Sequence, residues 1–320
     1  MSVILMNVLL SGCEKISSLI TGKGSIETLD PTNVTWDDMT MQGKVSTDLL
    51  AGGVSVGFIV SEGTDCTPET GRVIPVDQIA ADGSYSALAD GLAWESALYY
   101  RAYLNDGEYR MGDVKRVVAK TYEFGQVDLG LSVMWANANV GGLTLFSSGD
   151  HYAWGEVTVK MGFTWAGYKW SDGAYDQLKK YNGQNRFGVV DGKVQLEEAD
   201  DAAHFKLRGS WRMPTADEIK ELVDTYNSPD YKWEWKTVLA KEGYKVTCKT
   251  NGNSIFLPAS GTRKSASEVD GEGVKGYYWS SSIPNTSYVA VCLVFEAGKA
   301  PEVTNEERYQ GFTIRAVTDK

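Results

Sequence analysis

The stretch of sequence that decides the fold reads Gly209-Ser210-Trp211-Arg212-Met213-Pro214-Thr215 and continues into Ala216–Tyr226. Thr215 stands three residues before Glu218, the spacing of a capping box, in which the two side chains satisfy backbone N–H groups that the first helical turn leaves free. Apolar residues then recur with helical spacing at Ile219, Leu222, Val223 and Tyr226. The sequence therefore predicts an amphipathic helix, and we expect the short strands and aromatic-rich loops around it to pack on its apolar face.

Composition places the chain among globular proteins. It has 320 residues, of which 42% are hydrophobic and 23% are charged, and this length favours about two domains of roughly 100–200 residues each. The formal net charge of −11 argues against nucleic acid as a partner, because binding to phosphates requires a basic surface. The four cysteines include no C-x-x-C pair, so neither a zinc site nor a dithiol redox motif is predicted.

Residues 1–13 form a short apolar run that ends in Leu10-Ser11-Gly12-Cys13. The run resembles a bacterial lipoprotein signal peptide, and the resemblance implies that Cys13 carries the lipid and becomes the mature N-terminus. Such a protein is expected at the cell outer membrane, lipid-anchored and exposed at the surface, because no other stretch is apolar enough to cross a bilayer. The alternative is a buried N-terminal strand that ends in an ordinary cysteine. Residues 14–33 are polar and predict a tether.

Residues 34–122 predict an all-β sandwich, because short runs of alternating apolar and polar residues are separated by turn clusters. In the run 98–104 the even positions are expected to face the core. This part resembles a fibronectin type III-like domain of Bacteroidetes surface lipoproteins through Gly57-Phe58-Ile59-Val60-Ser61 and through Gly91-Leu92 followed by Tyr100-Arg101-Ala102-Tyr103. The family's proline and corner tyrosine are replaced here by Trp94 and Leu98. Such domains mostly serve as spacers.

Residues 123–320 contain six short motifs. They are Asp128-Leu129-Gly130-Leu131, Ala153-Trp154-Gly155-Glu156, Asp200-Asp201-Ala202-Ala203, Trp211-Arg212-Met213-Pro214-Thr215, Tyr278-Trp279-Ser280-Ser281-Ser282 and Ile314-Arg315-Ala316-Val317. In this order they resemble the Fibrobacter succinogenes major paralogous domain, a family abundant in Bacteroidetes surface proteins. The resemblance implies an α+β domain with a C-type-lectin-like fold, related to that of formylglycine-generating enzymes. It implies no established activity.

Catalytic and metal-binding chemistry finds little support in the sequence. Formylglycine-generating enzymes use a pair of cysteines, but Cys248 and Cys292 lie in strand-like runs, where a buried free thiol is expected rather than a reactive one. Glu197–Asp201 and Asp270–Gly273 offer oxygen ligands for calcium, yet a helix start and an acidic loop explain them as well. We therefore expect no enzyme activity and no cofactor, with calcium as the one metal left open. A cysteine oxidase is the enzymatic alternative.

Aromatic side chains are the remaining signal for a binding site. Three tryptophans inside the motifs, and a fourth shortly after the first motif, are expected in the core: Trp154, Trp211, Trp279 and Trp135. A second group lies in a segment rich in Gly, Lys and Asp: Trp165, Tyr168, Trp170, Tyr175 and Tyr181. Their rings can offer flat apolar faces with polar edges to a sugar or a protein. The alternative is a long loop that its own aromatic side chains hold against the core.

Together these features predict a non-catalytic, lipid-anchored binding protein of the cell surface that recognises a glycan or a protein partner. The sandwich would act as a spacer that holds out the lectin-like domain, and the membrane would be contacted through the lipid anchor only. The alternative is a structural or assembly subunit of a surface complex.

Overall fold

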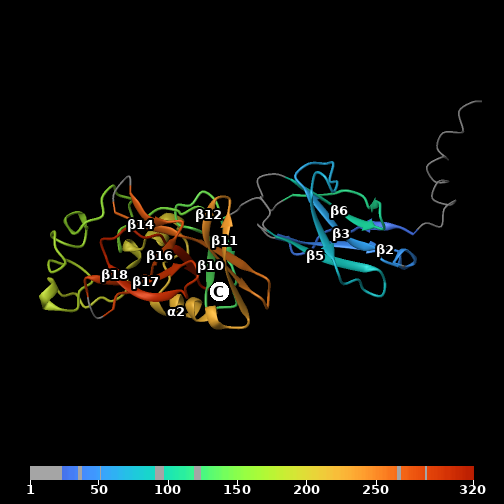
Figure 1. The fold of residues 1–320 in the computed structure, drawn as a ribbon. Coiled ribbons are helices and arrows are strands. Elements are labelled where there is room, and N and C mark those ends of the chain that lie inside the picture. The colour runs from blue at the N-terminus through green and yellow to red at the C-terminus, as the bar shows by residue number, and fades with distance from the viewer. Residues whose placement is uncertain are drawn as a thin grey trace, which may run out of the picture. The chain divides into compact units, whose positions relative to one another are not determined.

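The computed structural model describes residues 24–34, 38–50, 52–90, 97–118, 124–264, 268–284 and 287–320. Cys13, the predicted signal peptide and residues 14–23 of the predicted tether lie outside the described residues. The chain divides into two compact units, Met1–Thr121 and Tyr122–Lys320, called unit 1 and unit 2 below. Figure 1 shows the strands of unit 1 in blue to cyan and the elements of unit 2 in green to red. Within the described residues, no helix has the length and apolar character needed to span a membrane.

Unit 1 consists of two antiparallel sheets that share one core. The first has the strand order β1 (Ile26–Thr28), β2 (Asp38–Val45), β5 (Ser84–Asp90). The second has the order β4 (Arg72–Val76), β3 (Ser55–Ser61), β6 (Leu98–Asn105), β7 (Tyr109–Met111), and β8 (Lys115–Val117) also pairs with β6. Met39 and Met41 of the first sheet lie in the same buried cluster as Phe58 and Tyr100 of the second. The strand-rich architecture that the alternating runs predict is therefore present.

Strand β6 follows the predicted alternation with one exception. The residues at its even positions are buried: Leu98, Tyr100, Ala102 and Leu104. Tyr103, at an odd position, was expected to face solvent but is 2% exposed, because its ring packs with Ile59 and Cys66 in a second, small cluster. The Tyr100 hydroxyl donates a hydrogen bond to the Leu29 carbonyl, which ties β6 to the segment that follows β1.

Unit 2 contains four small antiparallel sheets. Their strand orders are β19 (Arg315–Thr318), β10 (Met134–Asn139), β9 (Gln126–Val127); β11 (Tyr231–Val238), β12 (Lys241–Cys248), β13 (Ser254–Pro258); β14 (Ser260–Arg263), β15 (Val269–Glu272); and β16 (Lys275–Trp279), β17 (Val289–Glu296), β18 (Glu302–Glu307). Two α-helices occur among the described residues, α1 (Ala202–Leu207) and α2 (Ala216–Asp224). Short 3-10 turns are η3 (Trp165–Gly167), η4 (Asn185–Phe187), η5 (Glu198–Asp200) and η6 (Thr225–Asn227), with η2 (Thr47–Leu49) in unit 1.

Helix α2 packs one face on the unit 2 core, as its sequence predicts. Ile219 and Leu222 are buried in a cluster that includes Trp135 and residues of β12, β13, β16 and β17, and Val223 and Tyr226 pack against the same cluster. The helix itself ends at Asp224, and η6 continues the turn to Asn227. The helical spacing of the apolar residues was therefore sufficient to identify both the element and its buried face.

Strand β11 was not predicted. It pairs with β12 over its full length, from Tyr231 opposite Cys248 to Val238 opposite Lys241. The two-residue turn between them holds Leu239 and Ala240 at φ of 47° and 60°. Turns of this kind favour Asn-Gly or Asp-Gly because both central residues adopt a left-handed backbone. Since neither residue carries that signal, a hairpin could not be predicted here.

Candidate functional site

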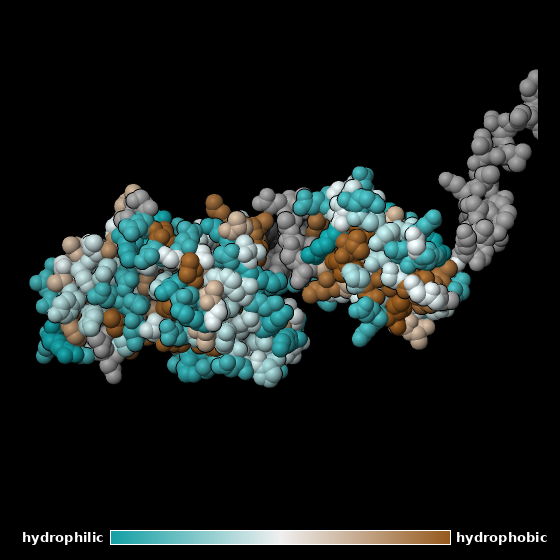
Figure 2. Space-filling view, in the orientation of Figure 1, coloured by the Kyte–Doolittle hydropathy of each residue, from teal (hydrophilic) through white to brown (hydrophobic). Residues whose placement is uncertain are grey.

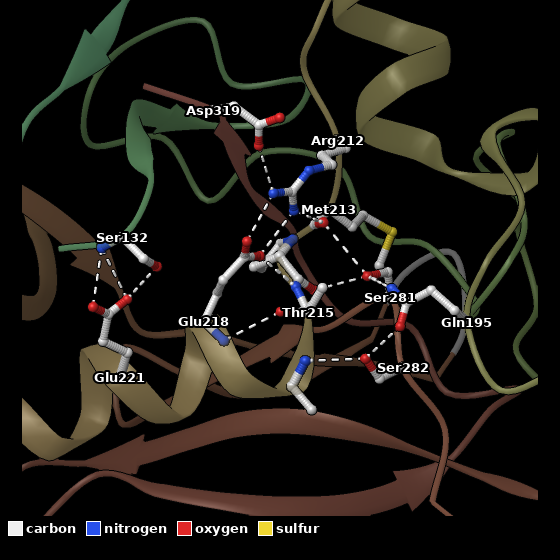
Figure 3. Close-up of polar contacts among 12 residues, drawn as sticks. Ser132, Gln195, Arg212, Met213, Thr215, Glu218, Glu221, Ser281, Ser282 and Asp319 are labelled. Carbon is white, nitrogen blue, oxygen red and sulfur yellow. Dashed lines mark hydrogen bonds and ion pairs between the residues drawn. The ribbon is translucent and has the colours of Figure 1, made fainter.

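The motif before α2 holds the start of the helix. Thr215 Oγ1 accepts a hydrogen bond from the Glu218 N–H at 3.2 Å, and the Glu218 carboxylate accepts one from the Thr215 N–H at 2.7 Å, which completes the predicted capping box. The same carboxylate accepts hydrogen bonds from both terminal nitrogens of Arg212, at 2.8 and 2.7 Å (Figure 3). Asp319 accepts a further bond from Arg212 at 2.9 Å. Glu218 is therefore both a helix cap and the bidentate partner of a guanidinium group.

This ion pair is shielded and fixed from two sides. The side chain of Glu218 is 13% exposed and that of Arg212 is 32% exposed. Burial alone would raise the pKa of Glu218, but the hydrogen bonds from Arg212 and Thr215 outweigh it and hold the pKa below its ordinary value. The backbone of Arg212 also exchanges two hydrogen bonds with Val317 of β19, at 3.0 and 2.9 Å. The charge on Glu218 therefore persists at neutral pH in a fixed position.

A serine run after β16 supports the other side of the helix start. The Ala216 N–H donates to Ser282 Oγ at 3.0 Å, and Ser282 Oγ donates to Gln195 Oε1 at 2.8 Å. The Ser281 N–H and hydroxyl both donate to the Pro214 carbonyl, at 2.7 and 3.1 Å. Figure 3 shows Gln195, the two serines and Thr215 converging from three different segments of the chain. These contacts bring together residues that lie more than 60 positions apart.

The converging segments border a pocket of about 460 Å³. We call it the α2 pocket. Its lining includes Gln195, Glu198, Asp201, His204, Trp211 and Ser281. Small-molecule sites typically enclose roughly 300–1,000 Å³ and combine apolar surface with a few fixed polar groups. The α2 pocket fits that description, with one indole, one imidazole, one carboxamide and two carboxylates.

Two acidic residues of the α2 pocket differ in their surroundings. Glu198 is 77% exposed, and one of its oxygens lies 2.8 Å from His204 Nε2. Asp201 is 5% exposed and caps α1 by accepting the His204 N–H at 3.0 Å, and it also accepts the Met213 N–H at 2.8 Å. Burial raises the pKa of Asp201, although these backbone hydrogen bonds oppose the shift. Asp201 is therefore a structural cap that borders the pocket, whereas Glu198 is open to a ligand.

Ser281 and His204 of the pocket each contact another group. A serine nucleophile needs a base within hydrogen-bond reach. The Ser281 hydroxyl instead bonds to the Pro214 carbonyl and to Gln195, and the His204 imidazole lies against Glu198. Across the described ranges, no group of three or more His, Cys, Asp or Glu side chains is placed to hold a metal ion. The pocket offers an aromatic ring and several hydrogen-bonding groups.

Two of the five predicted ring-surface residues, Tyr168 and Tyr181, belong to the core. They are 2% and 0% exposed. The Tyr168 hydroxyl donates to the Trp154 carbonyl at 2.8 Å, and the Tyr181 hydroxyl donates to the Asp200 carboxylate at 2.7 Å. A phenol can be buried where its hydroxyl finds such a partner. These two rings are therefore not available to a ligand, which corrects their assignment.

The other three rings of that segment are not fully buried, and each has a partner within the fold. Trp170 donates its indole N–H to the Gly155 carbonyl at 2.7 Å, and the Trp165 ring packs on Tyr309 with centroids 5.1 Å apart. Tyr175 is 49% exposed and packs edge-on against Tyr288. This geometry supports the alternative in which the loop is held against the core by its own aromatic side chains.

Asp200 anchors the same segment electrostatically. Its carboxylate is 5% exposed and accepts hydrogen bonds from Lys169 at 3.2 Å, from Lys180 at 2.6 Å and from the Tyr181 hydroxyl. The ammonium groups of Lys169 and Lys180 also lie 4.1 and 4.9 Å from the centroid of the Trp170 ring. Burial acts to raise the pKa of Asp200, but the bonds from Lys180, Tyr181 and Lys169 outweigh it and lower the pKa.

The acidic groups considered for calcium are paired with lysines. Lys180 and Lys193 both contact Glu197, and their hydrogen bonds lower its pKa to about 2. In the other segment, Asp270 lies 2.8 Å from the Lys264 ammonium and Glu272 lies 2.9 Å from that of Lys241. A calcium ion would have to displace these ammonium groups from the carboxylates.

The two cysteines of the predicted oxidase alternative lie in different sheets. Cys248 is on β12, and Cys292 is on β17. They are 3% and 0% exposed, and burial raises the pKa of the Cys292 thiol well above its ordinary value. Reactive thiols need a lowered pKa and access to solvent. The prediction that both are buried free thiols is confirmed.

Sequence reasoning did not identify the α2 pocket as a site. Trp211 was expected in the core with Trp135, Trp154 and Trp279, but it is only partly buried and lines the pocket, whereas the other three are at most 2% exposed. The available signal was the set of motifs, since Asp201 and Trp211 belong to two of them and both border the pocket.

Comparisons with known proteins add little to this geometry. No protein-family model and no curated protein matches the chain. Among solved structures, the chain is similar to the sensor domain of the anti-sigma factor RsgI4 of Pseudobacteroides cellulosolvens, with 12% identity over 31% of this chain and 96% of that one and a TM-score of 0.26. A solution structure of that domain gives 14% identity, 32% and 78% coverage and a TM-score of 0.26. A likeness this low identifies neither a shared fold nor a function.

Proposed function

We propose that this chain is a lipid-anchored protein of the cell surface that binds a glycan, without catalysis, in the α2 pocket. The observation that carries the proposal is the lining of the pocket. Trp211 supplies an aromatic ring, and Gln195, Glu198 and His204 supply hydrogen-bonding groups around it. Sugars present both a C–H face that packs on aromatic rings and hydroxyl groups that need donors and acceptors. A pocket with both kinds of group is suited to them.

The fixed frame of the pocket supports the same proposal. Arg212, Glu218 and Ser282 hold the helix start through bonds of 2.7–3.0 Å, so the backbone around the pocket is set before a ligand arrives. Binding to a preformed site avoids the entropy cost of ordering loops. Figure 2 shows the visible face of unit 2 as mostly hydrophilic, with hydrophobic residues scattered over it.

The proposed location rests on the sequence. The run that ends in Leu10-Ser11-Gly12-Cys13 supports lipid attachment at Cys13. The resemblances to fibronectin type III-like and Fibrobacter succinogenes major paralogous domains support a spacer and a C-type-lectin-like domain on the outer membrane. Labelled fatty acid should be incorporated into the wild-type chain and not into Cys13→Ala. Equal labelling of both proteins would refute the anchor.

The binding proposal is tested on a glycan array with the full chain. Binding should fall at least about tenfold in Glu198→Ala and in His204→Ala, because each change removes a hydrogen-bonding group from the pocket. Lys220→Ala is the matched control: Lys220 is on α2, 63% exposed, and does not line the pocket. An array without any binding, or binding that both pocket variants retain, would refute a glycan site here.

The second candidate is an assembly subunit of a surface complex. Apolar side chains at Tyr175, Val189 and Val190 are 49%, 62% and 46% exposed within sixteen positions of one another, and exposed apolar clusters mark protein interfaces. This role predicts a partner that co-purifies from outer membranes in a fixed ratio and is lost in Val189→Asp. It also predicts no response to sugars.

A further inference from the structure

We infer that the α2 pocket selects a sugar that carries an ammonium group over neutral and anionic sugars. The inference rests on the proposed function, since it names the ligand class of the same pocket. It follows from the charges that line the pocket, from the way in which its one guanidinium is neutralised, and from the aromatic ring beside them.

The positive charge of Arg212 is not available to an anionic ligand. Two carboxylates, Glu218 and Asp319, lie within 2.9 Å of its terminal nitrogens. One guanidinium with two carboxylates leaves a net negative charge at this side of the pocket. No lysine is among the lining residues. A uronate or a sulfated sugar would therefore meet repulsion rather than a counter-ion.

Glu198 provides a partner for a cation. Its side chain is 77% exposed, and the contact with His204 uses only Oε1, so the second oxygen remains open to a ligand. An ammonium group gains more from this carboxylate than a neutral hydroxyl does, because charge attraction adds to the hydrogen bond. Asp201 adds a second acidic group to the lining.

Trp211 adds to the same preference. Trp211 lines the pocket, and its ring packs edge-on against Phe124 with centroids 5.3 Å apart. An ammonium group near an indole is attracted by the ring in a way that a hydroxyl is not. The same ring can pack on the C–H face of the sugar. One ligand class, an amino sugar with a free amine, uses every one of these groups.

The test compares β-1,4-linked oligosaccharides of equal length that differ only at C2, with an amine, an acetamide or a hydroxyl group. Calorimetric titration of the full chain at physiological salt and at a mildly acidic pH, where the C2 amine is protonated, gives the three affinities, and a galacturonate oligomer serves as the anionic ligand. We expect the amine to bind at least about tenfold tighter than the hydroxyl, and the galacturonate to bind weakest. In Glu198→Gln the amine should lose most of this advantage while the neutral affinities stay within about twofold.

Glu302→Gln is the matched control, because Glu302 is an exposed carboxylate on β18, outside the pocket lining, and its removal changes the net charge by the same amount. An equal loss of amine binding in both variants would overturn the inference, since it would indicate general attraction to an acidic protein. Equal affinity for the amine and the hydroxyl would overturn it while leaving the proposed function intact. If none of these oligosaccharides binds but the array identifies another ligand of the pocket, only the preference for an ammonium group is refuted. If no glycan on the array binds, the proposed function is refuted as well.

Discussion

Replacing Glu218 separates the two roles that this carboxylate combines. Glu218→Ala removes the partner of both Arg212 nitrogens and leaves the Thr215 N–H without its acceptor. Glu218→Gln keeps one oxygen that can accept the Thr215 N–H but removes the charge. Glu221→Ala is the matched control one turn along the same helix, where the carboxylate accepts bonds from Ser132 at the surface.

The expected losses in the free energy of unfolding follow from how far the Glu218 and Arg212 side chains are exposed. Exposed ion pairs contribute about 0.2–1 kcal/mol, and removing one partner of a buried pair costs about 3–5 kcal/mol. With side chains 13% and 32% exposed, the pair of Glu218 and Arg212 lies between these cases, at about 2 kcal/mol. The lost capping bond adds about 1 kcal/mol. We therefore expect Glu218→Ala to lower the free energy of unfolding by about 3 kcal/mol, Glu218→Gln by about half of that, and Glu221→Ala by less than about 1 kcal/mol.

Urea denaturation followed by tryptophan fluorescence measures these losses in unit 2, because eight of the ten tryptophans lie after residue 134. The pKa of Glu218 is lower in the folded state than in the unfolded state, where it is about 4.3. The ionised carboxylate therefore adds to the free energy of unfolding above that unfolded pKa, and this addition is lost as the pH falls through the folded pKa. The difference between wild type and Glu218→Gln should therefore shrink below about pH 4. A loss in Glu218→Ala no larger than in Glu221→Ala, or a difference that does not change with pH, would refute the reasoning.

Four further changes test other parts of the fold by the same measurement. Asp200→Asn should lower the free energy of unfolding by about 2 kcal/mol and speed trypsin cleavage after Lys169, because Lys169 and Lys180 lose their shared carboxylate. Unchanged cleavage would contradict the role of Asp200 in holding this segment. Leu239→Asn with Ala240→Gly should raise the free energy of unfolding by about 1 kcal/mol, since both positions have positive φ; a loss would show that the turn is not strained. Burial lowers the pKa of His151, so the unfolded state takes up its proton first and the free energy of unfolding should fall below about pH 6.5; His151→Gln should flatten that slope, and an unchanged slope would contradict the burial of the imidazole. Cys292→Ser should cost about 1–3 kcal/mol, because the hydroxyl replaces a fully buried thiol; no change would argue against its burial.

Elements whose signals are local were predictable from the sequence. The apolar spacing and the Thr215–Glu218 capping box of α2 involve residues at most four positions apart, and each is present in the structure. The same holds for the alternation of β6 and for the burial of Cys248 and Cys292. In each case the residues that decide the structure are neighbours along one helix or strand.

Features that depend on distant partners were not predictable. The α2 pocket depends on Gln195, which bonds to Ser281, 86 positions away, and on Ser281, which bonds to Pro214 in the segment before α2. Tyr168 and Tyr181 have the composition of an exposed loop around them, and their burial depends on acceptors at Trp154 and Asp200. The spacing of apolar residues along the sequence does not reveal a hydrogen-bond acceptor that lies in a distant segment.

Val317 has a consequence for the order in which the protein is built. It pairs with Trp135 of β10 and exchanges backbone bonds with Arg212, so the last strand of unit 2 joins the first part of that unit to the motif before α2. A nascent chain cannot complete this sheet until residues 315–318 have left the ribosome. The sheet of β9, β10 and β19 therefore forms only after the rest of unit 2 has been synthesised.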